Sequence, residues 1–146
     1  MALCRVLPAR GEVMYSGTPV VCLEPSCVAV FRDELARLFP DAARAKRLAK
    51  QTFTLAEYLE RIDWQPPAAG SGPRARVLVH GHCHQKAVLG MQSELKLLAA
   101  AGFEVDAPDS GCCGMAGSFC FKPEHYAASR QVGESVLVPA VRRATP

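Results

Sequence analysis

Two adjacent cysteines, Cys112 and Cys113, lie between glycines in the stretch DSGCCGMAGSFC, residues 109–120. Neighbouring side chains point apart in an extended chain, and a disulfide between adjacent cysteines strains the backbone. Such a pair is therefore a poor structural cross-link. Because thiolates are ligands for zinc and for iron–sulfur clusters, the stretch indicates a site of metal or redox chemistry.

The chain of 146 residues contains seven cysteines. The odd number argues against a fully paired disulfide framework, and in a reducing compartment such enrichment points to metal binding or redox work. The alternative is that most are small buried apolar side chains. That alternative suits the isolated Cys4 and Cys22 better than it suits the adjacent pair.

Composition argues against several classes of protein. The formal net charge is +3, and no run of Lys or Arg is interleaved with aromatic residues, so nucleic-acid binding has little support. No stretch approaches the ~18 apolar residues of a membrane span, and the N-terminus lacks the apolar core of a signal peptide. We therefore expect one soluble, cytoplasmic globular domain without membrane insertion.

The sequence contains no complete catalytic apparatus. It has no G-x-G-x-x-G motif, no P-loop, and no Ser/His/Asp order that its spacing supports. A nucleophilic Cys–His enzyme built on Cys83 is the weaker alternative, because sequence neighbours rarely face each other. Whether the chain is part of an enzyme is left open at this point.

The hydrophobic pattern alternates strands with helices. Short apolar runs predict strands at 18–23, 75–80 and 103–109, and helical spacing predicts helices at 26–39, 41–50, 54–62, from HCHQ to Gly102, and from Pro123 to about Pro139. A Pro- and Gly-rich flexible linker is expected near 65–74. This order predicts an α/β fold with three layers, in which helices cover both faces of a mostly parallel sheet.

The cysteines recur at equivalent places in this pattern. Cys27 follows the first predicted strand, Cys83 the second, and the Cys112–Cys113 pair the third. Because ligands collect beyond the carboxyl ends of parallel strands, we expect these cysteines on loops at one edge of the sheet. Four converging thiolates suit zinc or an iron–sulfur cluster, although the wide spacing is unlike a zinc finger.

Glycines surround the adjacent cysteines at positions 111, 114 and 117. Glycine lets the backbone approach a ligand closely, and amides at Gly111 and Gly114 are candidates to donate to cluster or thiolate sulfur. Such donors stabilise negative charge and raise a reduction potential. An ordinary turn is the alternative role for these glycines.

The other polar side chains near the cysteines have alternative roles. His82 and His84 flank Cys83 and are additional candidate ligands, although an indirect or structural role is favoured because alternation sends both away from the cysteine. Lys86 and Arg32 are candidates to balance the negative charge of a cluster, or are solvated helix residues. His80 and His125 are expected to be structural or solvated.

Three motifs carry a resemblance to a known family. EPSCVAVFRDEL, HGHCHQKA and DSGCCGMAGSF resemble the C-terminal cysteine-rich (CCG) domain of FAD-linked oxidases with an iron–sulfur region, a group that includes D-lactate, D-2-hydroxyglutarate and glycolate oxidase components. The same domain occurs in one of the subunits of heterodisulfide reductase. The resemblance covers residues 18–146 and leaves 1–17 unassigned. It implies that the cysteines of EPSC, HCH and CCG, namely Cys27, Cys83, Cys112 and Cys113, bind a cluster.

The chain also departs from that family. Cys120 stands where the family has a small residue, usually glycine, and is therefore a spare thiol or an additional candidate ligand. The flavin domain and the close C-x₂-C-x₂-C runs of the ferredoxin-like segment are absent. FAD is therefore expected on a partner domain or subunit, with the ferredoxin-like segment as a second partner. We expect the chain to be a C-terminal portion or a split subunit.

The resulting hypothesis is an iron–sulfur cluster-binding, electron-transfer domain of a flavin-dependent 2-hydroxyacid oxidoreductase of the D-lactate, D-2-hydroxyglutarate or glycolate type. A 4Fe–4S cluster is the favoured cofactor. The alternatives are a structural zinc-binding module that docks other domains, and a thiol redox sensor that uses Cys112 and Cys113.

Overall fold

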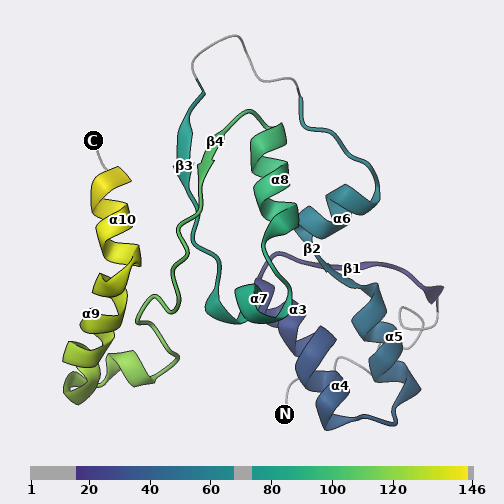
Figure 1. The fold of residues 1–146 in the computed structure, drawn as a ribbon. Coiled ribbons are helices and arrows are strands. Elements are labelled where there is room, and N and C mark those ends of the chain that lie inside the picture. Colours follow the sequence, from purple (N-terminus) through teal and green to yellow (C-terminus); the bar gives the residue numbers. More distant parts are fainter. Residues whose placement is uncertain (1–15, 68–73, 145–146) are drawn as a thin grey trace. The chain divides into compact units, whose positions relative to one another are not determined.

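A computed structural model describes residues 16–67 and 74–144. It divides into two compact units, with the boundary between Trp64 and Gln65 (Figure 1). Cys4 and most of the unassigned segment 1–17 lie outside the described residues, as does the middle of the expected linker, 68–73. The domain boundaries at 18 and 146 stay a prediction.

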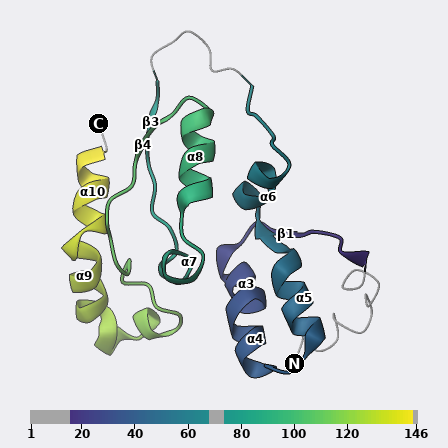
Figure 2. The same ribbon diagram turned by 45° about the vertical axis from the view of Figure 1, so that its right-hand side comes forward.

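The first unit contains one parallel strand pair and a set of short helices. Its elements are β1 (Val20–Cys22), α3 (Pro25–Ala29), the π-helical η1 (Val30–Glu34), α4 (Leu35–Leu38), α5 (Ala43–Gln51), β2 (Thr52–Thr54) and α6 (Leu55–Arg61). β1 pairs in parallel with β2, with Val20 opposite Thr52. The helices α3, η1 and α4 follow one another without a break, and η1 and α4 pack against α5 (Figure 2).

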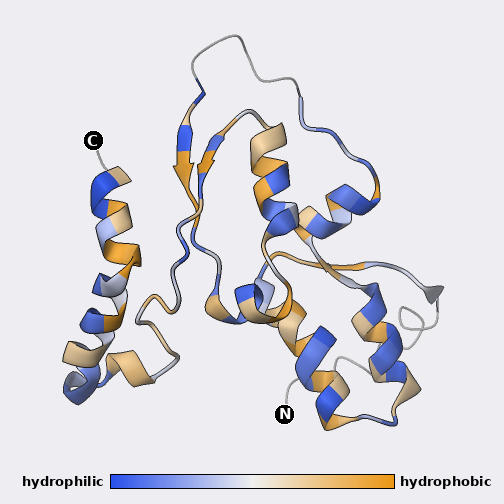
Figure 3. Cartoon of the chain, in the orientation of Figure 1, coloured by the Kyte–Doolittle hydropathy of each residue, from blue (hydrophilic) through white to orange (hydrophobic). Residues whose placement is uncertain are grey.

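Apolar side chains of α4 and α5 form the core of the first unit. Leu35, Ala45 and Leu48 are buried together, with Val20 and Phe31 packed against them. Ala45 and Leu48 are three residues apart and so share a helix face, while the other α5 positions are mainly hydrophilic (Figure 3). Burial of this face fixes α5 against the helix that begins at the EPSC motif.

A capping box begins α6, and its glutamate connects α6 to η1. The hydroxyl of Thr54 accepts the backbone N–H of Glu57 at 3.2 Å, and the Glu57 carboxylate accepts the backbone N–H of Thr54 at 2.9 Å. This is the capping box that the sequence predicts. The same carboxylate pairs with the Arg32 guanidinium through contacts of 2.7 and 2.8 Å. Arg32 therefore holds α6 against η1 and is not a freely solvated residue.

The second unit also contains one parallel strand pair. Its elements are β3 (Arg76–Leu78), α7 (Cys83–Val88), α8 (Gln92–Ala100), β4 (Glu104–Asp106), the short 3₁₀ helices η2 (Phe119–Phe121) and η3 (Pro123–His125), α9 (Tyr126–Ser135) and α10 (Leu137–Ala144). β3 pairs with β4, with Val77 opposite Val105. α8 lies beside β4, and α10 contacts β3 (Figure 1).

The buried residues of the second unit are small or polar. Ala140 is its only hydrophobic residue that is buried among those described, whereas Gln85 and Ser110 are both 3% exposed. The buried Gln85 amide donates to the Glu94 carboxylate at 3.0 Å, which satisfies it. Hydrogen bonds and close backbone contacts therefore position the segments of this unit more than large apolar side chains do.

The α/β class and the parallel strands confirm the coarse prediction. The described residues form two separate two-stranded sheets, and the three-layer arrangement stays a prediction. β2 was not predicted from the sequence, because its three residues run directly from α5 into α6 without turn residues.

Two predicted helices are each divided in two. α7 and α8 are separated at Gly90, whose φ of +81° ends α7 while its N–H binds the Gln85 carbonyl. α9 and α10 are separated at Val136. Pro139 lies within the first turn of α10 and does not end a helix, because a first-turn N–H needs no helical partner.

No helix among the described residues is both long enough and apolar enough to cross a membrane.

We predict that Glu57→Ala destabilises the chain by about 1–2 kcal/mol, because it removes the reciprocal cap of α6 and leaves Arg32 unpaired. Urea unfolding measures the change. Glu60→Ala on the same helix, at an exposed position, is the matched control and should change stability by less than about 0.5 kcal/mol. Equal effects of the two substitutions would contradict the role given to the capping box.

Candidate functional site

The two adjacent cysteines lie on an irregular loop that follows β4, as the sequence predicts. Cys112 and Cys113 are both half-buried, free thiols. The Cys112 Sγ accepts the backbone N–H of Gly114, and the Cys113 Sγ accepts that of Met115, each at 3.4 Å. Backbone amides directed at sulfur stabilise negative charge on it, so both side chains are suited to act as thiolate ligands.

Contacts with α9 hold the far side of this loop, which we call the CCG segment (residues 110–115). Gly114 has φ of +90°, and a Cβ there would lie 2.3 Å from the Ser129 carbonyl oxygen. The Ser129 hydroxyl donates to the Gly114 carbonyl at 2.6 Å. A Cβ on Gly133 would lie 3.0 Å from the Cys113 carbonyl oxygen. Only glycine fits at 114, because it provides both the left-handed backbone and the close approach.

The near side of the CCG segment is held by Lys86 of α7. Its ammonium donates to the carbonyl oxygens of Ser110 and Gly111, the latter at 3.0 Å. The buried Ser110 hydroxyl lies 2.8 Å from His80 Nδ1. Burial, with added repulsion from Lys86 and His82, lowers the pKa of His80. His80 therefore has the structural role expected of it.

Cys83 begins α7 and is exposed. It is the first residue of that helix, so the expectation that it lies on a loop is wrong. His82 takes the N-cap position of α7, and its side chain caps no backbone N–H there. His84 is half-buried within the helix. The role of His82 and His84 as additional ligands stays a prediction.

Cys27 is also part of a helix and not of a loop. The Glu24 carboxylate caps α3 by accepting the backbone N–H groups of Ser26 at 3.1 Å and Cys27 at 2.9 Å. Together with Pro25 in the first turn, this cap draws Cys27 into the helix. The Ser26 hydroxyl also donates to the Glu24 carboxylate. This hydrogen bond, followed by the backbone ones, lowers the pKa of Glu24 to about 2.

The Glu24 carboxylate also acts on the nearby thiols. Its hydrogen bond with the Cys27 side chain is the main factor that raises the pKa of Cys27, with burial and the negative charge of Glu24 adding to it. Burial, followed by the charge of Glu24, raises the pKa of Cys22. Cys27 is exposed, so its thiol is accessible to a metal ion that displaces the thiol proton.

Of the remaining candidate residues, Cys120 and His125 follow the CCG segment, and Gly111 lies near the start of that segment. The Cys120 thiol contacts the Gly117 carbonyl oxygen at 3.5 Å, within its own turn. His125 stacks on Phe119, with ring centroids 3.7 Å apart. Gly111 is exposed, a Cβ there would meet nothing within 4 Å, and its carbonyl accepts from Lys86.

The parallel pairing of β3 and β4 determines which cysteines share a sheet edge. Cys83 follows β3 and the Cys112–Cys113 pair follows β4, so these three follow the same edge of the second unit's sheet. Cys27 belongs to the first unit. Within residues 16–67 and 74–144, no three His, Cys, Asp or Glu side chains are close enough together to hold a metal ion. The four-cysteine site therefore stays a prediction.

The donor chemistry of the CCG segment fits a thiolate-bound metal group. Two accessible sulfurs with amide donors are present, on a backbone that Lys86 and α9 hold in place. The sequence pattern did not predict roles for Glu24, Ser110, Ser129 or Gly133. Their contacts, apart from the Glu24 cap, join residues 15 to 30 positions apart, for which the sequence carries no local signal.

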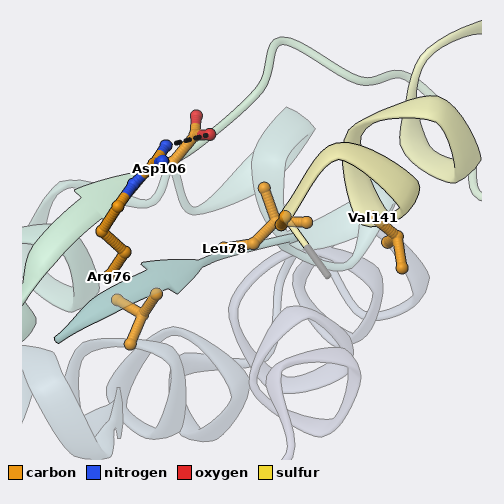
Figure 4. Close-up of a pocket in the computed structure, with 6 residues that line it drawn as sticks. Arg76, Leu78, Asp106 and Val141 are labelled. Carbon is orange, nitrogen blue, oxygen red and sulfur yellow. Dashed lines mark ion pairs between the residues drawn. The ribbon is translucent and has the colours of Figure 1, made fainter. Parts of the chain in front are cut away.

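An open hollow of about 300 Å³ lies elsewhere in the second unit (Figure 4). It is lined by β3, Asp106 and α10, and contains no cysteine or histidine. Arg76 and Asp106 meet across it at 3.8 Å, and both side chains are more than half exposed. Such a solvated ion pair contributes little, and the hollow has none of the predicted chemistry.

Comparison with known proteins finds relatives among oxidoreductase-associated proteins. The chain is 29% identical over 136 residues to one of the subunits of the anaerobic glycerol-3-phosphate dehydrogenase of Escherichia coli K12, and the match covers 90% of this chain and 33% of that protein. It is 31% identical over 129 residues to the lactate utilization protein of Geobacillus kaustophilus, covering 83% of this chain and 52% of that protein. The chain thus spans between a third and about half the length of these relatives.

These matches confirm the resemblance to the CCG-type cysteine-rich domains of FAD-linked oxidase and iron–sulfur proteins. No family model matches the chain. No solved structure gives a significant match.

We predict that Gly114→Ala lowers the free energy of unfolding by about 3 kcal/mol or more, because the added Cβ collides with the backbone of α9. Gly117→Ala is the matched control. It has φ of +53° with open space around it, so it should cost only the ~1–2 kcal/mol of a left-handed backbone. Thermal unfolding measures both. Equal losses would show that the close contact with α9 is absent.

Proposed function

We propose that this chain is the iron–sulfur cluster-binding, electron-transfer part of a dehydrogenase or oxidase system. The observation that carries the proposal is the CCG segment, where two adjacent thiols each accept a backbone N–H. Amide donors of this kind stabilise the additional negative charge of a reduced cluster. A purely structural zinc ion gains less from them, because it does not change its charge.

Cys27, Cys83, Cys112 and Cys113 are the proposed cluster ligands. Their support comes from the three motifs, from the accessibility of Cys27 and Cys83, and from the sulfur environment of the adjacent pair. A 4Fe–4S cluster is the proposed type. When bound, it would supply one-electron transfer, while the residues of this chain hold it, shield it and set the charge around it.

A flavin-bearing partner is the proposed electron source. The names of the two relatives refer to a glycerol-3-phosphate dehydrogenase and to lactate utilization, and both named compounds have a carbon–hydrogen bond next to a hydroxyl that a dehydrogenase can oxidise. Hydride removal of this kind is the chemistry of a flavin, which passes the electrons on one at a time. A 2-hydroxy acid is the proposed substrate class of that partner, and a ferredoxin-like segment is a second proposed partner.

We predict that the chain, prepared or reconstituted under anaerobic conditions, shows broad absorption near ~400 nm from thiolate-to-iron charge transfer. Dithionite should bleach this band because it reduces the cluster. Iron and sulfide analysis accompanies the spectra. A colourless protein with about one tightly bound zinc and no iron uptake would establish the zinc module instead. Protein without metal, in which Cys112 and Cys113 cycle reversibly between thiol and disulfide, would establish the thiol sensor.

We also predict a selective effect of Cys→Ser substitution. Serine at 27, 83, 112 or 113 should remove most of the bound iron, because each substitution deletes a thiolate ligand. Serine at 22 should leave the iron content near that of the wild type, and so should serine at 4. Iron content per folded chain is the measurement. A loss at Cys22 or Cys4 as complete as at Cys113 would show that the ligand assignment is wrong.

A further inference from the structure

One side chain joins α7 to the backbone that leads into the adjacent cysteines. The Lys86 ammonium donates to the carbonyl oxygens of Ser110 and Gly111, and lies 3.4 Å from the Ser110 hydroxyl oxygen. Ser110 and Gly111 are the two residues immediately before Cys112. A single side chain thus draws two successive carbonyls toward itself, which restricts the backbone at the point where the thiols begin.

The donor and acceptor groups of Lys86, Ser110 and His80 determine which atom donates in each of their hydrogen bonds. Lysine has donors only, so the Ser110 hydroxyl oxygen accepts from it and directs its own proton to His80 Nδ1 at 2.8 Å. That arrangement requires a neutral His80, in agreement with the lowered pKa of its imidazole. Ser110 is only 3% exposed, so water competes little for these bonds.

The contacts of Lys86 leave its charge in place. All three oxygen atoms that it touches belong to uncharged groups of Ser110 and Gly111. The Gly111 carbonyl is part of the peptide bond to Cys112. The ammonium therefore places a positive charge beside the first residue of the thiol pair, in partly buried surroundings where screening by water is weaker than at the surface.

We propose that Lys86 is a positioning residue for the CCG segment and supplies the positive charge that favours the reduced form of a metal cluster held there. The charge role rests on the function proposed above, whereas the positioning role does not. Because a reduced cluster carries one more negative charge than the oxidised cluster, a nearby fixed cation stabilises it and raises the reduction potential.

Hydrogen exchange of the metal-free chain tests the positioning role. Lys86→Met removes all three contacts, so the amides of residues 110–115 should exchange at least several-fold faster than in the wild type. Lys86→Arg keeps the charge and the donors and should restore slow exchange. Lys96→Met, which changes an exposed lysine on α8, is the matched control and should leave these amides unchanged. Unchanged exchange in Lys86→Met overturns the positioning role.

Redox titration of the iron-loaded chain tests the charge role. At a fixed potential, Lys86→Met should lower the ratio of reduced to oxidised cluster roughly tenfold, which is about 59 mV for a one-electron couple. Lys86→Gln keeps a donor without the charge and should shift the ratio as far as Met does, with exchange closer to the wild type. Lys86→Arg should lie near the wild type.

The two measurements separate this inference from the proposed function. If the cluster binds but its potential stays at the wild-type value in both Lys86→Met and Lys86→Gln, the charge role is overturned and the proposed function stands. If the wild-type chain takes up no iron, the proposed function and the charge role fall together, and the exchange comparison alone decides the positioning role. A purely structural lysine would change exchange without the charge-dependent difference between Gln and Arg.

Discussion

The hydrogen bonds that fix the CCG segment are the constraint on which the second unit depends. Adjacent side chains point apart, so a loop can present two neighbouring thiols together only if its backbone departs from the extended form. Lys86 holds the carbonyls before the pair, and the backbone of α9 meets Gly114 directly after it. The positive φ of Gly114 turns the chain directly after Cys113, at a position where any Cβ would collide with α9.

This mode of support explains the composition of the second unit's interior. A loop that brings carbonyl groups inward must have donors to meet them, because an unpaired buried carbonyl costs about 1–3 kcal/mol. Ser129 and Lys86 provide those donors. No described buried side-chain nitrogen or oxygen lacks a partner. The lack of large buried apolar side chains among the described residues of this unit and its many polar contacts thus have one cause, the support of a loop by α7 and α9.

Short-range signals made part of this structure predictable from sequence. The Thr54–Glu57 capping box appears as predicted because its two residues recognise each other within one helical turn. The α/β order was predictable from apolar runs, since the strands at 20–22, 76–78 and 104–106 fall inside the predicted ones. The exception, β2, is as short as the other strands but runs from α5 into α6 without turn residues, and only its pairing with β1 defines it.

Contacts between distant residues were not predictable in the same way. Lys86 and Ser110 are 24 residues apart, and nothing in HCHQKA indicates that its lysine reaches the backbone before Cys112. A proline such as Pro139 can mark either the end of a helix or the first turn of the next one. Proline is excluded from a helix interior but tolerated in a first turn, and only the break at Val136 decides between these. Candidate ligands were thus easier to identify than the residues that hold them.

The EPSC and CCG motifs have charged neighbours of opposite sign, a carboxylate at the first and an ammonium at the second. At the EPSC motif, Glu24 caps the helix and places a carboxylate beside Cys27, which raises the pKa of that thiol. At the CCG motif, the Lys86 ammonium donates to the carbonyls before the pair, and two backbone amides donate to the sulfurs. Metal ligation requires thiolates, so a metal bound at Cys27 as proposed would have to displace a proton that Glu24 helps to retain, whereas the sulfurs of the adjacent pair already accept backbone N–H donors. The carboxylate that orders the first motif would therefore oppose the proposed ligation there, whereas the second motif is ordered by an ammonium, which adds no such opposition.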